Sequence, residues 1–260
     1  MEGCGTATLI GIISPVLEIL LKKLTQDGRY EMSVPSFTYS SLSRFITCPR
    51  QYEAHQVLKY VPFKDTSATM YGKDLHLAAE NYIGKGEPLP ERFIFIKKFL
   101  DTLISIKGVK LCEYKLAIAK SDDRFEYCDY EAPHRYWRGI ADLVIIDEES
   151  QKAYIVDYKT GKSAKYADTK QLALLAAAVF LEFPYIKTIK AMLLFVVSNE
   201  VVKEEYTYEK GLKIFDTLAP VLAQRSVAYE TGIFNASPNG LCRQWCQATR
   251  CIHNGSYKGE

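Results

Sequence analysis

Two aspartates in the segment of residues 138–159 have the spacing of a shared metal site. The segment reads RGIADLVIIDEESQKAYIVDYK, in which two apolar runs flank the polar stretch DEESQK. This pattern is typical of a strand, a turn and a second strand. If Ile146 faces Ala153 across the turn, the antiparallel register places Asp142 opposite Asp157, with Cβ atoms about 4.5–5.5 Å apart.

A lysine completes this constellation. Lys159 lies two residues beyond Asp157 and therefore points to the same face of the strand. Two carboxylates this close do not both ionise without a cation, and hard oxygen ligands suit Mg²⁺ or Mn²⁺. A divalent metal, an activated water and a lysine together suit hydrolysis of a phosphodiester. The alternative is a surface hairpin with aligned charges, but the apolar runs indicate burial on both faces, where unused charges are costly.

The elements around this hairpin predict an α/β fold with a mixed central sheet flanked by helices. Patterns of apolar residues predict helices over residues 67–83, 91–106, 168–183 and 209–231, and strands over residues 109–119, 140–146, 153–158, 188–198 and 201–208. The order helices, strands, helix, strands, helix suits a sheet with helices on both faces.

Length and charge bound the class of protein. The chain has 260 residues, enough for one sizeable domain with a small appendage, and a net charge of +2 that does not imply a broadly basic surface. Residues 7–21 are apolar but too short and too broken for a membrane span, and no basic region precedes them. We therefore expect a cytoplasmic protein without a membrane partner, with residues 1–35 as an extension of unknown role that includes an amphipathic helix over residues 15–24, and a domain over residues 36–260.

Two further groups support the hairpin. His76 shares a helix face with Glu80. A lone histidine on a helix is usually a structural residue, but next to the hairpin His76 becomes a candidate third metal ligand. Glu113 lies mid-strand among apolar residues and either pairs with Arg138 or approaches the metal; we favour the buried ion pair.

A basic loop follows the second strand. Lys162, Lys165 and Lys170 surround Gly161 close to the metal site. They form either an edge that tracks phosphates or a solvated loop. Gln171 opens the next helix and is a candidate contact to a base or to the DNA backbone.

The cysteines indicate a second metal site. Cys242, Cys246 and Cys251 lie close together in the polar C-terminal tail, residues 235–260. In a cytoplasmic chain, three such thiolates with a fourth ligand point to tetrahedral zinc or a four-iron cluster. Cys48 is the natural fourth ligand, and His253 is an alternative. Metal binding there would clamp the tail to Cys48, since the tail has few large apolar residues to dock it.

Four ordered motifs resemble a known group. The set GKDLH at 72–76, RGIAD at 138–142, VDYKTG at 156–161 and a downstream Gln171 is similar to the RecB-type nuclease branch of the PD-(D/E)XK superfamily, over residues 37–253. Each motif alone is weak, but the ordered set is fairly specific. The resemblance implies a restriction-endonuclease-like fold.

The resemblance also implies roles for individual residues. His76, Asp142 and Asp157 would bind the metals, Lys159 would be the catalytic lysine, and the carbonyl of Tyr158 would be a further ligand. Gln171 would begin the family's Q-x-x-x-Y motif, and with Lys162 and Tyr158 it forms the predicted substrate-binding set. The sequence departs from the motif at position 175, where leucine replaces the tyrosine that would contact DNA.

The cysteine frame resembles the iron–sulfur nucleases of the same superfamily, which include AddB recombination nucleases and CRISPR spacer-acquisition exonucleases. In those proteins one cysteine precedes the nuclease core and three follow it. Here the tail reads C-x3-C-x4-C rather than C-x2-C-x5-C, with the same outer span. The resemblance implies a 4Fe-4S cluster on Cys48, Cys242, Cys246 and Cys251, with Zn²⁺ as the alternative.

These observations predict a Mg²⁺- or Mn²⁺-dependent deoxyribonuclease, an exonuclease that acts on DNA ends or single strands in repair, recombination or turnover. Without a helicase motif it would act alone, a form found in phage proteins, or with a separate helicase or recombination protein. Two alternatives stay open: a non-catalytic DNA-binding or assembly module on the same fold, and a site-specific endonuclease, which the lack of a recognition domain disfavours.

Overall fold

The computed structural model describes residues 34–62, 64–122 and 124–259. The chain divides into two compact units. Of the described residues, the sheet unit comprises Pro35–Thr47 and residues 62–222, and the cysteine unit comprises Val34, Cys48–Val61 and residues 223–259. The helix predicted over residues 15–24, and the extension up to residue 33, lie outside the described residues.

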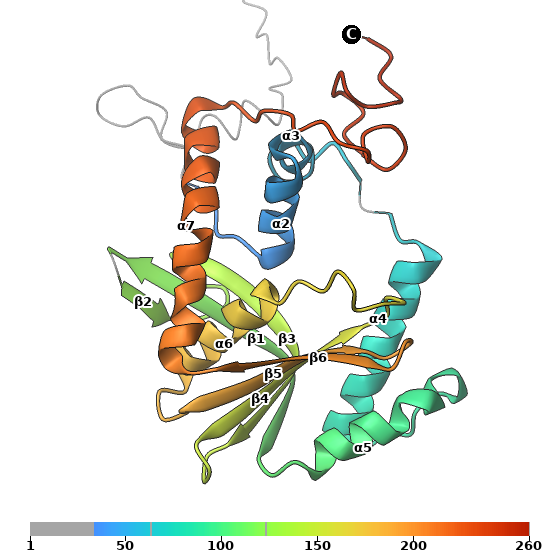
Figure 1. The fold of residues 1–260 in the computed structure, drawn as a ribbon, viewed down its shortest axis with the longest axis vertical. Helices are drawn as coiled ribbons and strands as arrows, with labels where there is room; N and C mark the ends of the chain where they lie inside the picture. The colour runs from blue at the N-terminus through green and yellow to red at the C-terminus, as the bar shows by residue number, and fades with distance from the viewer. Residues whose placement is uncertain (1–33, 63, 123, 260) are drawn as a thin grey trace, which may run out of the picture. The chain divides into compact units, whose positions relative to one another are not determined.

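The sheet unit is built on a six-stranded mixed sheet, which confirms the predicted α/β class (Figure 1). The strand order is β2-β1-β3-β4-β5-β6. The strands are β1 (Val109–Ser121), β2 (Arg124–Tyr127), β3 (Arg135–Asp147), β4 (Lys152–Lys159), β5 (Thr188–Phe195) and β6 (Glu200–Tyr206). Among these six strands, β4 and β5 pair in parallel and the other neighbours pair antiparallel.

The central hairpin has the predicted register. Ile146 pairs with Ala153 across the turn, and the paired region extends to Leu143 and Val156. Asp142 and Asp157 are the next residues along each strand, so they lie where β3 and β4 stop pairing.

Helices cover both faces of this sheet (Figure 1). Successive strand residues point to opposite faces. Val144 and Ile155 pack in a core with α6, whereas Leu143 and Ile145 pack in a second core with α4 and α5. The helices of the first face are α2 (Tyr39–Thr47), α6 (Lys170–Glu182) and the start of α7 (Tyr208–Thr231), and those of the second face are α4 (Ser67–Glu80), a 3-10 turn (Glu91–Ile96) and α5 (Lys97–Ser105).

Helix α6 connects the two parallel strands and is buried on every side. Its residues Leu172–Phe180 are all buried, so it has no solvent-facing stripe. A helix that is apolar all round belongs in the interior of a fold. Because α6 begins close to the end of β4, its first turn is brought near Asp157 and Lys159.

The cysteine unit has a small polar and aromatic core of its own. A short helix, α3 (Pro49–Tyr52), continues into a π-helical turn (Glu53–Val57). The Tyr52 hydroxyl accepts a hydrogen bond from Arg225 Nε at 3.0 Å and lies 2.9 Å from the Tyr229 hydroxyl. Arg225 is buried, and its charge is satisfied by this contact and by the two aromatic faces.

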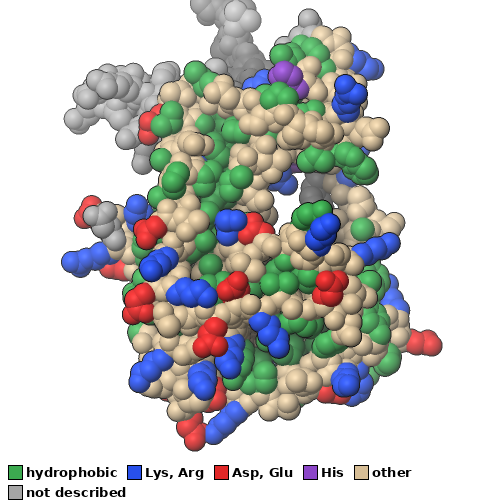
Figure 2. All heavy atoms as spheres, viewed as in Figure 1, with side chains coloured by type: hydrophobic (Ala, Val, Ile, Leu, Met, Phe, Trp, Pro, Cys, Tyr) green, Lys and Arg blue, Asp and Glu red, His purple; other side chains and the backbone are tan. Residues whose placement is uncertain are grey.

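Charges of both signs are interspersed over the visible surface, as the near-neutral net charge suggests (Figure 2). Within the described part of the chain, no helix has the length and apolar character needed to cross a bilayer.

Candidate metal and catalytic site

The end of the β3–β4 hairpin positions the first carboxylate. The backbone N–H of Tyr158 donates to Asp142 Oδ2 at 2.7 Å, which fixes the carboxylate just beyond the last paired residues. The side chain of Asp142 is 11% exposed. A nearly buried carboxylate held by one backbone donor still has lone pairs for a cation.

Helix α4 supplies the histidine. The helix starts at a capping box in which the side chains of Thr66 and Thr69 each accept from the other's backbone N–H. Ten residues after Thr66, His76 Nδ1 lies 3.2 Å from Asp142 Oδ1 and Nε2 lies 3.1 Å from the Tyr158 carbonyl oxygen. Burial acts to lower the pKa of His76, but the hydrogen bond to Asp142 and the surrounding carboxylates outweigh it and raise the pKa above its ordinary value.

Glu113 joins this group through an irregularity in β1. The β1–β3 pairing passes from Cys112/Leu143 to Tyr114/Ala141, and Glu113 between them has φ 48°, in the left-handed region. Such a conformation is strained for a residue other than glycine and is concentrated at functional sites. Burial and the charge of Asp142 raise the pKa of Glu113.

Among the described residues, His76, Glu113 and Asp142 offer ligand atoms that all lie within 4.8 Å of one another. The prediction of a Glu113–Arg138 ion pair is wrong. The β1–β3 register places Arg138 opposite Ala117, and its guanidinium lies 3.7 Å from Glu131 instead. Glu113 therefore agrees with the alternative prediction, in which it approaches the candidate metal site.

Asp157, Lys159 and Gln171 form a second set beside this group. Lys159 Nζ lies 2.5 Å from Asp157 Oδ2, and Gln171 Nε2 donates to Asp157 Oδ1 at 3.0 Å. The Gln171 side-chain oxygen lies 3.4 Å from Lys159 Nζ, so one amide holds both groups. Burial and the charge of Asp142 raise the pKa of Asp157 to about 6, against the lowering effect of Lys159.

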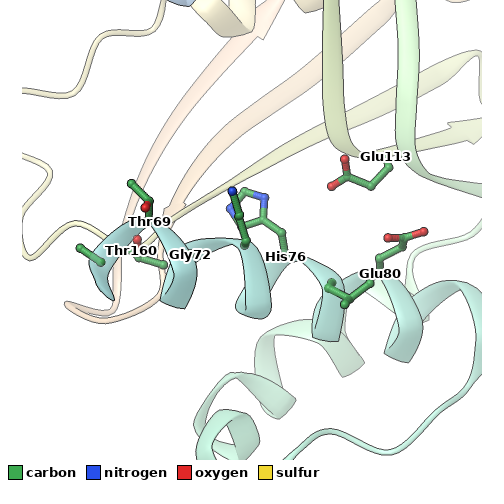
Figure 3. Close-up of a pocket in the computed structure, with 9 residues that line it drawn as sticks. Thr69, Gly72, His76, Glu80, Glu113 and Thr160 are labelled. Atoms are coloured by element: carbon green, nitrogen blue, oxygen red, sulfur yellow. The ribbon is translucent and has the colours of Figure 1, made fainter. Parts of the chain in front are cut away.

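A cavity of about 750 Å³ opens over the group along α4. His76 lies midway along its wall, with Glu80 and Glu113 at one end and Thr69, Gly72 and Thr160 at the other (Figure 3). Glu80 shares the α4 face of His76, as its spacing predicts. The site is therefore accessible to a ligand several atoms across.

The remaining predicted contacts differ in their exposure. Lys162 is exposed on the loop after β4. The ring of Tyr158 is buried in the core on the α4 side, so the predicted substrate contact of Tyr158 does not include its ring. Leu175 is also buried, in the core around α6.

The four predicted cluster cysteines belong to one unit. Cys48 Sγ accepts a hydrogen bond from the backbone N–H of Ser237 at 3.3 Å, so Cys48 contacts the tail. Cys242 Sγ accepts in the same way from Asn239, also at 3.3 Å. Cys246 and Cys251 pack in a small apolar cluster with Ala54 and Ala248.

Sequence reasoning gave no role to Thr160, and it favoured the wrong partner for Glu113. A threonine directly after VDYK carries no pattern of its own. For Glu113 a signal did exist, because it is an ionisable residue in the middle of an apolar strand. That strand, β1, is the sheet neighbour of β3, which carries Asp142.

A family model described as the PD-(D/E)XK nuclease superfamily matches residues 36–251. No curated protein matches the sequence. Among solved structures, the "Putative exonuclease" from Eubacterium rectale is 11% identical with a TM-score of 0.49, over 88% of this chain and 94% of that one. The protein described as SSO0001 is 13% identical with a TM-score of 0.41, over 82% of this chain and 87% of that one.

Proposed function

Because this chain belongs to the PD-(D/E)XK nuclease superfamily, we propose that it is a Mg²⁺- or Mn²⁺-dependent exonuclease that hydrolyses phosphodiester bonds in DNA. The observation that carries the proposal is the convergence of His76, Glu113 and Asp142 beside the Asp157–Lys159 pair. Each part of this set has a defined place in phosphodiester hydrolysis.

The donor set fits a hard divalent cation. Glu113, Asp142 and Asp157 offer carboxylate oxygens, and the pKa values of Glu113 and Asp157 are raised partly because these charges repel one another. We propose that His76, Asp142, Asp157 and Glu113 hold the ion, with the Tyr158 carbonyl as a further candidate. When bound, a divalent cation lowers the pKa of water and offsets negative charge on a phosphate.

Lys159 is the proposed catalytic lysine. Its ammonium is anchored by Asp157 and Gln171, which limits its movement before substrate arrives. A fixed cation that faces the reacting phosphate stabilises the negative charge that develops during hydrolysis. Gln171 is then a positioning residue for Lys159 and Asp157; its direct contact with DNA and that of Lys162 stay predictions.

We also propose that this protein binds a 4Fe-4S cluster through Cys48, Cys242, Cys246 and Cys251. The backbone N–H groups directed at the sulfurs of Cys48 and Cys242 suit thiolates, which are stronger acceptors than thiols. Iron and acid-labile sulfide should be measured on protein purified without oxygen. Stoichiometric zinc in place of iron would favour the zinc alternative. If neither metal is present at a stoichiometric level, the proposal of a metal site on these cysteines is wrong.

The test of the nuclease is degradation of end-labelled linear DNA and of covalently closed circular DNA with Mn²⁺ or Mg²⁺. We expect the wild type to degrade the linear substrate only, and Asp157→Ala and Lys159→Ala to be inactive. Lys152→Ala is the matched control, because Lys152 is an exposed lysine at the opposite end of the same strand. DNA binding without cleavage by folded wild type would favour the binding module, and cutting of the circle at one sequence would favour the endonuclease.

A further inference from the structure

The cavity beside the metal group follows one face of α4. Residues four apart lie on the same side of a helix, and Ala68, Gly72, His76 and Glu80 all line the cavity. At 1.5 Å per residue, the twelve steps from the first to the last of them span about 18 Å. The cavity therefore extends well beyond the groups that would hold a metal.

The two ends of the cavity differ in charge. Glu80 and Glu113 lie at one end, whereas Thr69 and Thr160 lie at the other (Figure 3). Lys73 also lines the cavity, and its ammonium contacts Asp65, which precedes the first residue of α4. Glu80 is not in the proposed ligand set, so its carboxylate would repel a phosphate chain at that end even with a metal bound, whereas the hydroxyls of Thr69 and Thr160 and the ammonium of Lys73 are donors for phosphate oxygens. A strand whose scissile phosphate lies by His76 would thus continue toward Thr160.

The end of the cavity near Thr160 is wide because Ala68 and Gly72, which line it, have a small side chain or none. A Cβ added to Gly72 would lie 3.6 Å from Thr160 Oγ1, an ordinary contact. Packing therefore does not require glycine here, although glycine in a helix costs about 1 kcal/mol relative to alanine. A larger side chain at this position would enter the cavity.

The cavity volume sets the size of the ligand. Sites of about 300–1,000 Å³ hold a drug-sized molecule, which is the scale of one or two nucleotides of a single strand. Lys73 Nζ contacts Asp65 at 2.6 Å, with both side chains largely exposed. An exposed pair of this kind contributes at most about 1 kcal/mol, so the ammonium can also serve a phosphate.

We propose that this α4 cavity seats the one or two nucleotides next to the scissile phosphate of a single nucleic-acid strand. Ala68 and Gly72 form its floor, and Thr69, Lys73 and Thr160 contact the strand's phosphates. The inference rests on the proposed nuclease function, because that function is what brings a phosphate to His76.

The test fills the cavity and measures binding apart from cleavage. Gly72→Leu places a branched side chain in the cavity, Gly72→Ala adds only a methyl group, and Met70→Phe adds bulk to an exposed position of the same helix. Binding of a labelled single-stranded oligonucleotide is followed by fluorescence anisotropy in EDTA, and cleavage is followed with Mn²⁺.

We expect Gly72→Leu to weaken oligonucleotide binding by about tenfold or more, the equivalent of one overpacked contact. Its KM should rise more than its kcat falls, and Gly72→Ala should lose less. Met70→Phe should stay within about twofold of wild type, which is the spread of a neutral surface change. Circular dichroism and the melting temperature establish that each variant is folded.

The outcomes separate this inference from the nuclease proposal. Binding and cleavage by Gly72→Leu at wild-type levels would overturn the inference. Loss of binding by Gly72→Leu, in a protein whose wild type binds the strand but never cleaves it, would support the cavity and reject the nuclease. If Gly72→Leu does not fold, Thr160→Val removes one hydroxyl without added bulk; we then expect about a two- to tenfold loss of binding, and an unchanged affinity would overturn the inference.

Discussion

Replacing Asp157 by asparagine should stabilise the protein when no metal is present. Asp157 is 3% exposed, and its pKa is raised to about 6 by burial and by the charge of Asp142. Asparagine has nearly the same shape, removes the charge and keeps an oxygen that can accept from Gln171. The usual loss of stability on changing a buried residue should therefore be reversed at this position.

The magnitude follows from proton linkage. The pKa of Asp157 is raised from 3.8 in an ordinary environment to about 6 in the fold. One pKa unit corresponds to about 1.4 kcal/mol, so ionised Asp157 costs the folded state about 3 kcal/mol. Because the folded-state pKa is the higher one, the folded protein binds more protons between about pH 4 and pH 6, and stability falls as pH rises through this range. The pKa of about 6 already includes the lowering effect of Lys159. Allowing for the imperfect fit of an amide in place of the carboxyl group, we expect Asp157→Asn to gain about 1–3 kcal/mol at pH 7.5.

The assay is urea unfolding in EDTA at several pH values, repeated with Mn²⁺. In EDTA the advantage of Asp157→Asn should grow from pH 4 to pH 7.5. With Mn²⁺ at a thousandfold excess over its Kd the order should reverse, because that excess stabilises the wild type by about 4.1 kcal/mol. Asp216→Asn, on the exposed side of α7, is the control and should change stability by less than about 0.5 kcal/mol.

A variant Asp157→Asn that is less stable than wild type in EDTA at pH 7.5 would refute this reasoning. It would mean that the contacts of Asp157 with Lys159 and Gln171 outweigh its burial and its repulsion from Asp142. An advantage that does not change between pH 4 and pH 7.5 would refute the assigned cause, because the effect would then not arise from ionisation.

Three further changes test other parts of the site and the core. Glu113→Gln should weaken Mn²⁺ binding by about tenfold or more in calorimetry, as loss of a ligand exceeds the usual cost of losing a supporting group; equal affinity would exclude Glu113 as a ligand. Lys159→Met should lower the single-turnover cleavage rate by about 10²–10⁴-fold while Mn²⁺ still binds, and a rate near wild type would remove its catalytic role. Gly139→Ala should destabilise the fold by about 1–3 kcal/mol in urea, because its new carbon would lie 2.6 Å from the buried Trp137 ring, and unchanged stability would show that the ring moves freely.

The sequence predicts the hairpin well because its register depends on local, alternating patterns. The pairing of Ile146 with Ala153 follows from two apolar runs and a short polar turn, and it places Asp142 and Asp157 without any knowledge of the rest of the fold. The chain order of helices and strands likewise predicts the mixed sheet. These features depend on residues close together in the sequence.

Glu113 shows why the remainder could not be predicted. Its approach to Asp142 requires a left-handed backbone in the middle of a strand, and no residue type in LCEYKL indicates that conformation. Its strand also pairs with β3 across more than twenty intervening residues, so its partner depends on a register set elsewhere. The contact of Cys48 with Ser237 joins residues even farther apart in the chain.

The burial of α6 on all sides affects how this protein loses activity on heating. Leu172–Phe180 contribute nine buried residues with no polar face. Partial opening of the sheet unit would therefore expose a continuous apolar surface to other chains. Such surfaces promote association before refolding, and thermal inactivation then becomes irreversible and rate-controlled. Since Gln171 lies in the first turn of this helix, loss of the helix from the core would disassemble the candidate site and seed aggregation in a single event.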